Sequence, residues 1–315
     1  MKKIVFIILF ILISLFTHGK VITSFDEISK PQMMSINKDY LLITEGPSIF
    51  VYSMKDFSLV KKFGQAGEGP REFKVSAFGV PMIAYFHKNN IFVSSDSKIS
   101  YFTPAGEFIK EMRTPPFAVF RPFRDQYVAT GSSVNKDQQT VLTINLHNPK
   151  LEKIKELYKS DVSVGPNASF NYPMNNFTYE PYKDKLYLVR GKEGFVIEVM
   201  SLEGKSLYSI KKDYKKIKVT GEYKDKTFHN FKTNPNFKQF YDFFKQRITF
   251  KDHYPAIQDV RVTDDRIHVI TFKKKDKKTE CIILNLKGKE IKRVYVPYPE
   301  LYGMDYLPEY DIFNK

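Results

Sequence analysis

The chain repeats one short pattern of strands and turns, and this repeat constrains its fold more than any other feature. Polar four-residue turns begin at Ser53, Thr103, Asn145, Ser201 and Asn285, so that the spacings between them are 50, 42, 56 and 84 residues. Each turn follows a hairpin rich in β-branched and aromatic residues and precedes one further strand. Units of about 40–50 residues with four strands each are typical of propeller blades. The sequence therefore predicts an all-β fold, a β-propeller.

The number of blades follows from how the units fill the chain. Five units are clear, over residues 35–74, 80–114, 118–160, 170–212 and 255–297. Residues 20–34 and 298–315 remain, and together they offer 33 residues for a sixth blade, with Val21 to Phe25 as the strand that closes the ring. We expect six four-stranded blades. A ring of five is the alternative, because 33 residues are few for a unit that elsewhere takes about 40.

The long last spacing predicts an insertion between two blades, from Tyr214 to Pro255. Removing these 42 residues restores a spacing of 42. Asn234 and Pro235 suit the start of a helix. One face of that helix carries an aromatic stripe at i, i+3, i+4 and i+7, formed by Phe237, Phe240, Tyr241 and Phe244. We expect a helical insertion over residues 214–255 whose stripe packs on the propeller; a lid over the central channel is the alternative.

Residues 1–19 have the layout of a secretory signal peptide. The positive start Met1-Lys2-Lys3 precedes a 13-residue apolar run from Ile4 to Phe16, and Gly19 is a small residue suited to the cleavage site. Such a run is short for a membrane-spanning helix, although an uncleaved anchor is the alternative. We expect the leader to be removed and residues 20–315 to form one soluble domain, periplasmic or extracellular, with no integral membrane segment.

The charge of the chain is strongly positive. There are 50 Lys and Arg residues against 35 Asp and Glu, a formal net charge of +15, and much of it lies in lysine clusters at 211–212, 215–216, 273–275 and 277–278. Such clusters attract an acidic partner, such as a membrane surface or a polyanionic glycan, or they form solvated turns. Association with an acidic surface is one hypothesis. Nucleic acid is not expected as a partner, because an exported protein rarely meets it.

The segment from Phe63 to Phe73 reads Phe-Gly-Gln-Ala-Gly-Glu-Gly-Pro-Arg-Glu-Phe. It resembles the inter-blade segment of NHL-repeat six-bladed propellers, in which spaced glycines lie between two phenylalanines. The strand at 90–94 and the strand and turn at 97–108 continue the likeness, so that it covers residues 40–112. More narrowly, the chain is similar to secreted NHL-like propellers of Bacteroidetes, most of which have no assigned activity. The resemblance implies six blades, and it implies little about function because most blades here lack the Asp that follows the inner strand in such repeats.

Propellers bind ligands at the mouth of the central channel, which the linking segments and the starts of the inner strands form. Tyrosines there suit carbohydrate or peptide contacts, because they combine apolar area with a hydroxyl group. A cation–π packing role is the alternative for the arginine that lies between aromatic residues. The candidate ligand-binding residues in these segments are Arg121, Asn171, Tyr172, His253, Tyr254, Asp259, Tyr302 and Asp305.

The sequence contains no recognised catalytic signature. Gly-x-Ser-x-Gly, His-Glu-x-x-His and closely spaced cysteine pairs do not occur, and the single cysteine, Cys281, lies in an apolar run where a buried, inert thiol is expected. We therefore expect no catalytic residue, no metal ligand and no cofactor, with a divalent ion in the channel as the alternative. The leading hypothesis is a non-enzymatic scaffold that binds a protein, peptide or glycan; the rival is a metal-dependent hydrolase or lyase with its site in the channel.

Overall fold

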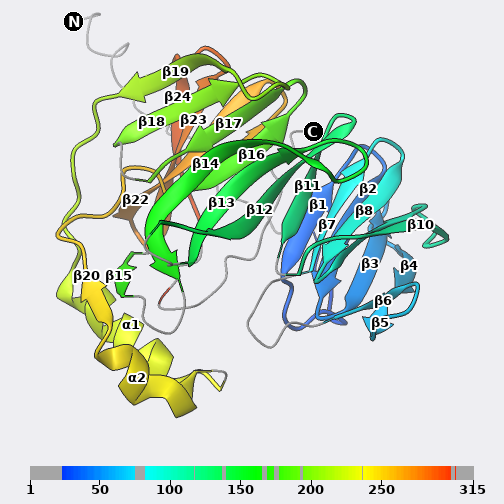
Figure 1. Ribbon diagram of the computed structural model, residues 1–315, viewed down its shortest axis with the longest axis horizontal. Helices are drawn as coiled ribbons and strands as arrows, with labels where there is room; N and C mark the ends of the chain where they lie inside the picture. Colours follow the sequence, from blue (N-terminus) through cyan, green and yellow to red (C-terminus); the bar gives the residue numbers. More distant parts are fainter. Residues whose placement is uncertain are drawn as a thin grey trace, which may run out of the picture.

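The computed structural model describes residues 23–298 and Tyr302, except residues 75–81, 117, 137–139, 165–168, 174–176, 192–193 and 236. The described residues form five four-stranded antiparallel sheets, each built from strands consecutive in the chain. This is a β-propeller, and Figure 1 shows its blades in chain order, from blue and cyan to orange. The predicted fold class is confirmed.

Each blade runs from an inner strand to an outer strand. Blade 1 consists of β1 (Met33–Ile36), β2 (Tyr40–Glu45), β3 (Ser48–Ser53) and β4 (Leu59–Phe63). Blade 2 consists of β7 (Ile83–His87), β8 (Asn90–Ser95), β9 (Lys98–Phe102) and β10 (Phe108–Arg113). Blade 3 consists of β11 (Val119–Phe123), β12 (Gln126–Val134), β13 (Thr140–His147) and β14 (Lys153–Val164). Blade 4 consists of β16 (Thr178–Tyr182), β17 (Lys185–Val189), β18 (Phe195–Met200) and β19 (Ser206–Lys212). Blade 5 consists of β21 (Asp259–Thr263), β22 (Arg266–Lys275), β23 (Lys278–Asn285) and β24 (Glu290–Val296).

The expectation of six blades is wrong, since the described chain forms five. The N-terminal segment that was expected to close the ring forms no strand over residues 23–32. Instead it packs on the outward face of blade 1, where the Phe25 ring lies 4.2 Å from the Tyr52 ring and the Tyr52 hydroxyl donates to Glu27 Oε1 at 2.6 Å. Apolar side chains of this segment therefore cover a sheet face instead of extending a new sheet. The C-terminal residues 303–315 lie outside the described residues.

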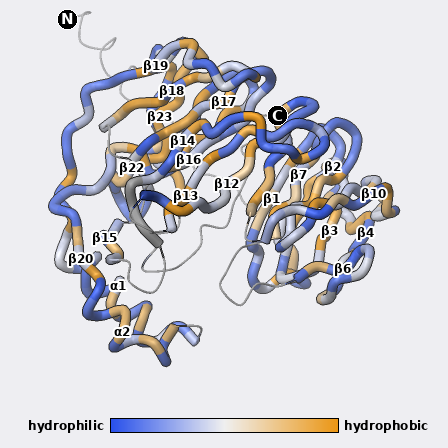
Figure 2. Tube along the Cα trace, in the orientation of Figure 1, coloured by the Kyte–Doolittle hydropathy of each residue, from blue (hydrophilic) through white to orange (hydrophobic). Residues whose placement is uncertain are grey.

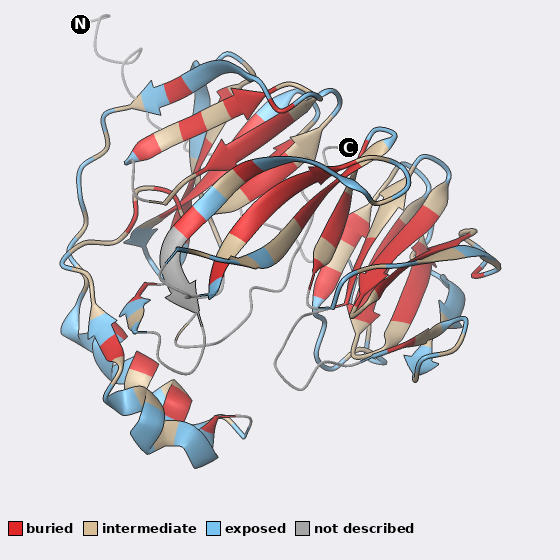
Figure 3. Ribbon diagram, viewed as in Figure 1, coloured by how far each residue is buried: buried red, intermediate tan, exposed pale blue. Residues whose placement is uncertain are grey.

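The core consists of apolar layers between neighbouring blades. One cluster joins blades 1 and 2 through residues such as Val51 and Val93, and further clusters join blades 2 and 3, 3 and 4, and 4 and 5. The middle strands are almost entirely buried, whereas outer strands such as β4 are mostly exposed (Figure 3). Figure 2 shows the same gradient, because its hydrophobic segments gather in the strands of the blades and its hydrophilic segments in the turns. The period-2 alternation of the strands thus places one apolar face against each neighbour.

A glycine turn packs blades 2, 4 and 5 on the blade that precedes each of them. Gly106, Gly204 and Gly288 have φ of +78°, +67° and +85°, a conformation that favours glycine. A Cβ added to Gly106 would lie 2.9 Å from Phe63 Cδ1, one added to Gly204 would lie close to Leu157, and one added to Gly288 would lie 2.6 Å from Ile210 Cγ2. The turn between the third and fourth strands of these blades therefore packs directly on the outer strand of the preceding blade.

The insertion is helical, as predicted, but its helices differ from the predicted one. The main helix, α1 (Gly221–Thr233), lies earlier than expected and begins after Thr220, whose side chain accepts a hydrogen bond from the Tyr223 backbone amide. Asn234 ends this helix instead of starting one. Of the predicted stripe, Phe237 precedes a short 3₁₀ turn, η2 (Lys238–Phe240), which Phe240 ends, and Tyr241 and Phe244 lie in α2 (Tyr241–Lys245).

Two linking segments contain short parallel strand pairs, and one of these pairs joins the insertion. The link between blades 3 and 4 contributes β15 (Phe170–Tyr172), which pairs in parallel with β20 (Ile248–Phe250) of the insertion. The glycine-rich link between blades 1 and 2 contains a second short parallel pair, β5 (Gln65–Ala66) with β6 (Glu72–Phe73). We call the end of the propeller that carries these links the linking end. No helix in the described part of the chain has the length and apolar character needed to cross a bilayer.

Candidate functional site

Two of the predicted site residues, Arg121 and Asp259, belong to one polar network on the inner strands. Arg121 lies in β11 and donates to the Tyr179 carbonyl at 2.8 Å and to both carboxylate oxygens of Glu180 in β16 at 3.0 and 2.9 Å. Its guanidinium also lies 4.8 Å from the centre of the Tyr85 ring. Both bonds to Glu180 come from Nη2, and hydrogen bonds between charged groups of this kind are stronger than those between neutral groups. The cation–π alternative for Arg121 is thus observed, with the rings of Tyr85 and Tyr179 in place of the flanking phenylalanines.

The same network continues into blade 5. Arg261 of β21 donates to Glu180 Oε2 at 3.1 Å and lies 3.3 Å from Asp259 Oδ2, while the Thr178 hydroxyl donates to Asp259 Oδ1 at 2.9 Å. The four ionised side chains are 9–13 % exposed. Two arginines face two carboxylates, so the charges balance within the network. We call Tyr85, Arg121, Thr178, Tyr179, Glu180, Asp259 and Arg261 the inner-strand network.

The network follows from the register of the blades. Tyr85, Arg121, Glu180 and Arg261 each occupy the third position of an inner strand, and each pairs with the third residue of the next strand. Equivalent positions of neighbouring blades therefore bring these side chains together. The sequence does hold a signal for the pair of Arg121 and Glu180. The segments Phe-Arg-Pro-Phe at 120–123 and Tyr-Glu-Pro-Tyr at 179–182 place opposite charges before a proline at the same position of two neighbouring blades. Sequence reasoning singled out Arg121 and missed Glu180 and Arg261.

Three other predicted site residues form part of the core of the insertion. Tyr172 is 1 % exposed, and its ring lies 6.0 Å from the Phe231 ring of α1. The rings of Tyr254 and Tyr302 lie 5.3 and 5.6 Å from the Tyr223 ring of the same helix. These tyrosines belong to one aromatic cluster of the insertion and its neighbouring links. Their observed contacts are those of packing residues.

The remaining predicted residues lie apart from the inner-strand network. Asn171 is exposed on β15, where it pairs in register with Thr249. His253 forms an isolated antiparallel bridge with Lys218 at the base of the insertion. Asp305 lies outside the described residues. The eight predicted residues therefore do not form one site: two share the inner-strand network, three pack in the insertion, two lie at its edge, and one is not described.

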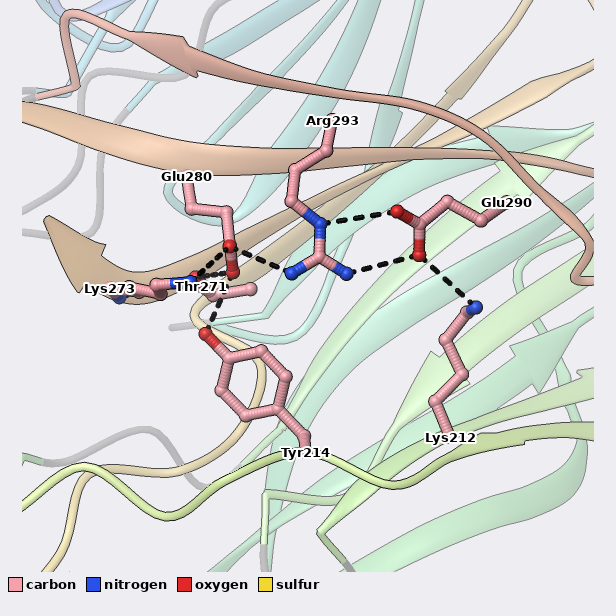
Figure 4. A network of polar contacts seen from close by, with 7 residues as sticks. All are labelled: Lys212, Tyr214, Thr271, Lys273, Glu280, Glu290 and Arg293. Carbon is pink, nitrogen blue, oxygen red and sulfur yellow. Dashed lines mark hydrogen bonds and ion pairs between the residues drawn. The ribbon is translucent and has the colours of Figure 1, made fainter. Parts of the chain in front are cut away.

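A second polar network anchors the insertion to blade 5 (Figure 4). The side chain of Glu280 in β23 is fully buried and accepts hydrogen bonds from Tyr214, Thr271, Lys273 and Arg293 at 2.8, 3.0, 3.2 and 3.0 Å. Burial opposes ionisation of this carboxyl group, but the hydrogen bonds outweigh it and hold the pKa of Glu280 below its usual range. Since Tyr214 is the first residue of the insertion, this network fixes where the insertion leaves the propeller.

Titratable groups elsewhere are held in structural roles. His87 and His147 each have a ring nitrogen 2.9 Å from a backbone carbonyl, and burial lowers the pKa of both. Burial raises the pKa of the Cys281 thiol to about 11, as expected for an inert cysteine. Over the residues that the structure describes, His, Cys, Asp and Glu side chains form no group of three or more suited to a metal ion.

The insertion is joined to the linking end through β15 and β20, and its tip carries two exposed aromatic rings. Phe240 is 47 % exposed and Phe243 is 36 % exposed, and the Arg247 guanidinium lies 3.9 Å from the centre of the Phe243 ring. Lys238 and Lys245 are exposed in the same segment. We call residues 238–247 the insertion tip. Figure 1 shows it at a corner of the molecule, away from the five blades.

Comparisons with known proteins do not assign the chain to a family. No family model matches the chain, and no curated protein matches it. Similar solved structures include Hsv2 of Kluyveromyces lactis, with 11 % identity, a TM-score of 0.40, and coverage of 84 % of this chain and 63 % of that one. Another is hydrazine synthase of Kuenenia stuttgartiensis, with 11 % identity, a TM-score of 0.41, and coverage of 89 % and 70 %. The chain is a β-propeller, and the resemblance to NHL repeats rests on residues 40–112 alone.

Proposed function

We propose that the chain is an exported, NHL-like propeller that acts as a non-enzymatic scaffold and binds a protein, peptide or glycan at its linking end. One observation carries this proposal: the acidic and basic side chains of the inner-strand network are engaged with one another. A catalytic acid or base must instead exchange protons with a substrate, which four ionised groups balanced among themselves at 9–13 % exposure are poorly placed to do. We therefore place ligand binding in the linking segments around the inner-strand network.

The linking end has the rigidity that recognition requires. Lys98 is 3 % exposed, and its ammonium group donates to the carbonyls of Glu68 and Gly69 at 3.3 and 2.8 Å and to Glu111 at 2.8 Å. Glu72 accepts from the Gly69 amide at 2.9 Å across the same loop. Because the glycine-rich link is held from two sides, little conformational entropy remains to be lost when a ligand binds there.

The proposal is tested by mapping binding on the protein surface. Purified protein would be screened against arrayed glycans and a random peptide library, and each probe that binds would be titrated against three variants. Arg71→Ala and Asn171→Ala change exposed side chains at the linking end, and Lys292→Ala is the control because it changes an exposed side chain on the outer strand β24. We expect at least one linking-end variant to weaken binding while the control binds as the wild type does. Binding that is lost only in the control would contradict the proposal.

The rival hypothesis is a metal-dependent hydrolase or lyase, and two measurements distinguish it from a non-enzymatic scaffold. Metal analysis of the purified protein would favour the rival if a divalent ion were present in a one-to-one ratio and survived dialysis. Incubation of each bound glycan or peptide with the protein would favour it if the probe were cleaved. Export is tested on its own by N-terminal sequencing of protein recovered from the periplasm or the medium, where we expect a chain that begins at Lys20.

A further inference from the structure

The charge of the insertion is high for its length. Residues 214–255 contain ten Lys and Arg against four Asp and Glu, so that 42 of 315 residues carry +6 of the formal +15. Three of these cations, Lys215, Lys216 and Lys218, precede α1 in the segment that leads from blade 4, and the other seven lie between Lys224 and Lys251 in the unit that projects from the blades (Figure 3). The insertion thus carries +6 over 42 residues, against +9 over the other 273, and this higher density of positive charge attracts an anionic partner.

The insertion tip adds exposed apolar surface to this charge. Phe240 and Phe243 are three residues apart, 47 % and 36 % exposed, at the end of η2 and in α2. The Arg247 guanidinium stacks 3.9 Å from the Phe243 ring and donates to the Phe243 carbonyl at 3.2 Å. A cation is thus held beside an exposed ring, as in segments that lie in the headgroup region of a bilayer, with aromatic rings inserted and basic groups at the phosphates.

Two rings of the tip, Phe240 and Phe243, are not part of the aromatic cluster below them, whereas Tyr241 and Phe244 pack against it. Phe237 and Phe231, which are 8 % and 0 % exposed, form the buried part of this unit, with ring centres 6.1 Å apart. Phe240 and Phe243 are left outward. Exposed apolar residues elsewhere, such as Leu207 and Ile154, lie on outer strands of the blades. Where two are adjacent, as Leu59 with Val60 and Leu207 with Tyr208, successive strand residues point to opposite faces of the sheet and do not form one patch. Two neighbouring exposed phenylalanines next to basic residues therefore differ from the ordinary apolar content of a surface.

We propose that the insertion tip binds reversibly to an anionic lipid bilayer, with Phe240 and Phe243 inserted among the headgroups and with Lys238, Lys245 and Arg247 at the lipid phosphates. The choice of a bilayer over an acidic protein rests on shape and charge: the tip is a projecting corner, and its paired rings and cations match a flat surface that is apolar below an anionic layer. This inference is independent of the proposed function and adds an orientation to it, since a tip bound in this way would bring the linking end near the membrane.

The first test is co-sedimentation of the full chain with vesicles of phosphatidylcholine alone or with about one third phosphatidylglycerol. We expect binding only to the anionic vesicles, weakened as salt is raised. Lys238→Gln/Lys245→Gln should lower the partition coefficient by roughly fivefold for each lysine. Phe240→Ser/Phe243→Ser should lower it by at least about tenfold through lost apolar burial, without a change of charge. The matched controls are Leu207→Ser/Ile154→Ser and Lys205→Gln/Lys289→Gln, which should bind as the wild type does.

The second test uses the absence of tryptophan from the chain. Phe240→Trp introduces a single indole at the tip, and its fluorescence should shift to the blue when anionic vesicles are added. Leu207→Trp is the control and should not shift. Far-UV circular dichroism would show that each variant is folded. The proposal is overturned if Phe240→Ser/Phe243→Ser binds anionic vesicles like the wild type, if the perimeter controls lose binding equally, or if heparin or an acidic protein binds the tip while vesicles do not.

Discussion

The contact between Gly288 and Ile210 allows a direct measurement of what inter-blade packing contributes to stability. Gly288 has φ +85°, and a Cβ there would lie 2.6 Å from Ile210 Cγ2 and 3.0 Å from Ile210 Cγ1. Gly194 has a similar φ of +76°, but a Cβ there meets no atom within 4 Å. Substitution of either glycine by alanine therefore imposes the same backbone strain, and only Gly288→Ala adds a steric conflict.

The two costs can be estimated separately. An L-residue in the left-handed region loses about 1–2 kcal/mol, and this loss is shared by both variants. Forcing a methyl group into a packed contact adds about 1–3 kcal/mol, and Ile210 cannot easily move away because it is 4 % exposed within the cluster that joins blades 4 and 5. We expect Gly288→Ala to lower the free energy of unfolding by about 3 kcal/mol and Gly194→Ala by about 1 kcal/mol.

The assay is urea unfolding followed by tyrosine fluorescence and by circular dichroism. The double variant Gly288→Ala/Ile210→Ala completes a mutant cycle, in which removal of the isoleucine side chain should relieve the conflict. Its total loss should thus be smaller than the sum of the two single losses. Equal losses for Gly288→Ala and Gly194→Ala, or an additive cycle, would refute the view that the turn is pressed against the preceding blade.

Three further predictions concern charge and protonation. Glu280→Gln should lower the free energy of unfolding by about 2–4 kcal/mol in urea titrations, because the buried carboxylate has two cationic donors, whereas Asp125→Asn in an exposed pair should show no measurable loss. Burial and the nearby Arg266 depress the pKa of His268, so its contribution is present above the unfolded pKa of about 6.5 and is lost as the pH falls below it. The urea midpoint should therefore fall less between pH 7.5 and 5.5 in His268→Gln than in the wild type, and an equal fall would contradict this. Arg121→Met should cost about 3 kcal/mol because Glu180 stays buried, and the Arg121→Met/Glu180→Met variant should recover part of that loss in thermal melting; full additivity would show that the pair is not coupled.

The fold could be predicted because the strands and turns of each blade can be recognised from short stretches of sequence. Hairpins such as Tyr40–Glu45 with Ser48–Ser53 combine a period-2 apolar pattern with a tight turn, and both properties are visible over a dozen residues. The number of blades could not be obtained in this way. It depends on whether the terminal segments form strands, and residues 23–32 had too few alternating residues to decide that they would cover the face of blade 1 instead.

The candidate site could be predicted only in part, because its contacts join residues far apart in the chain. Arg121 attracted attention through its aromatic neighbours, but its partner Glu180 lies 59 residues further on. Only the alignment of one blade with the next shows that the two share a position. The helix boundary failed for a local reason: Asn234 favours either end of a helix, and the run before it, Gly221 to Thr233, carries its buried residues at Tyr223, Thr227 and Phe231 without a continuous apolar stripe.

Each of the three turn glycines packs on a strand that precedes it in the chain, so these inter-blade contacts form in order from the N-terminus during synthesis. Synthesis runs from the N-terminus, so Phe63 is made before Gly106, and Leu157 before Gly204. The outer strand of each of these blades therefore lacks its packing partner until most of the next blade has been made. The interval is longest for Ile210, since the whole insertion is made before Gly288. Of these three glycine contacts, the one that covers the outer strand of blade 4 is therefore completed after the longest stretch of synthesis.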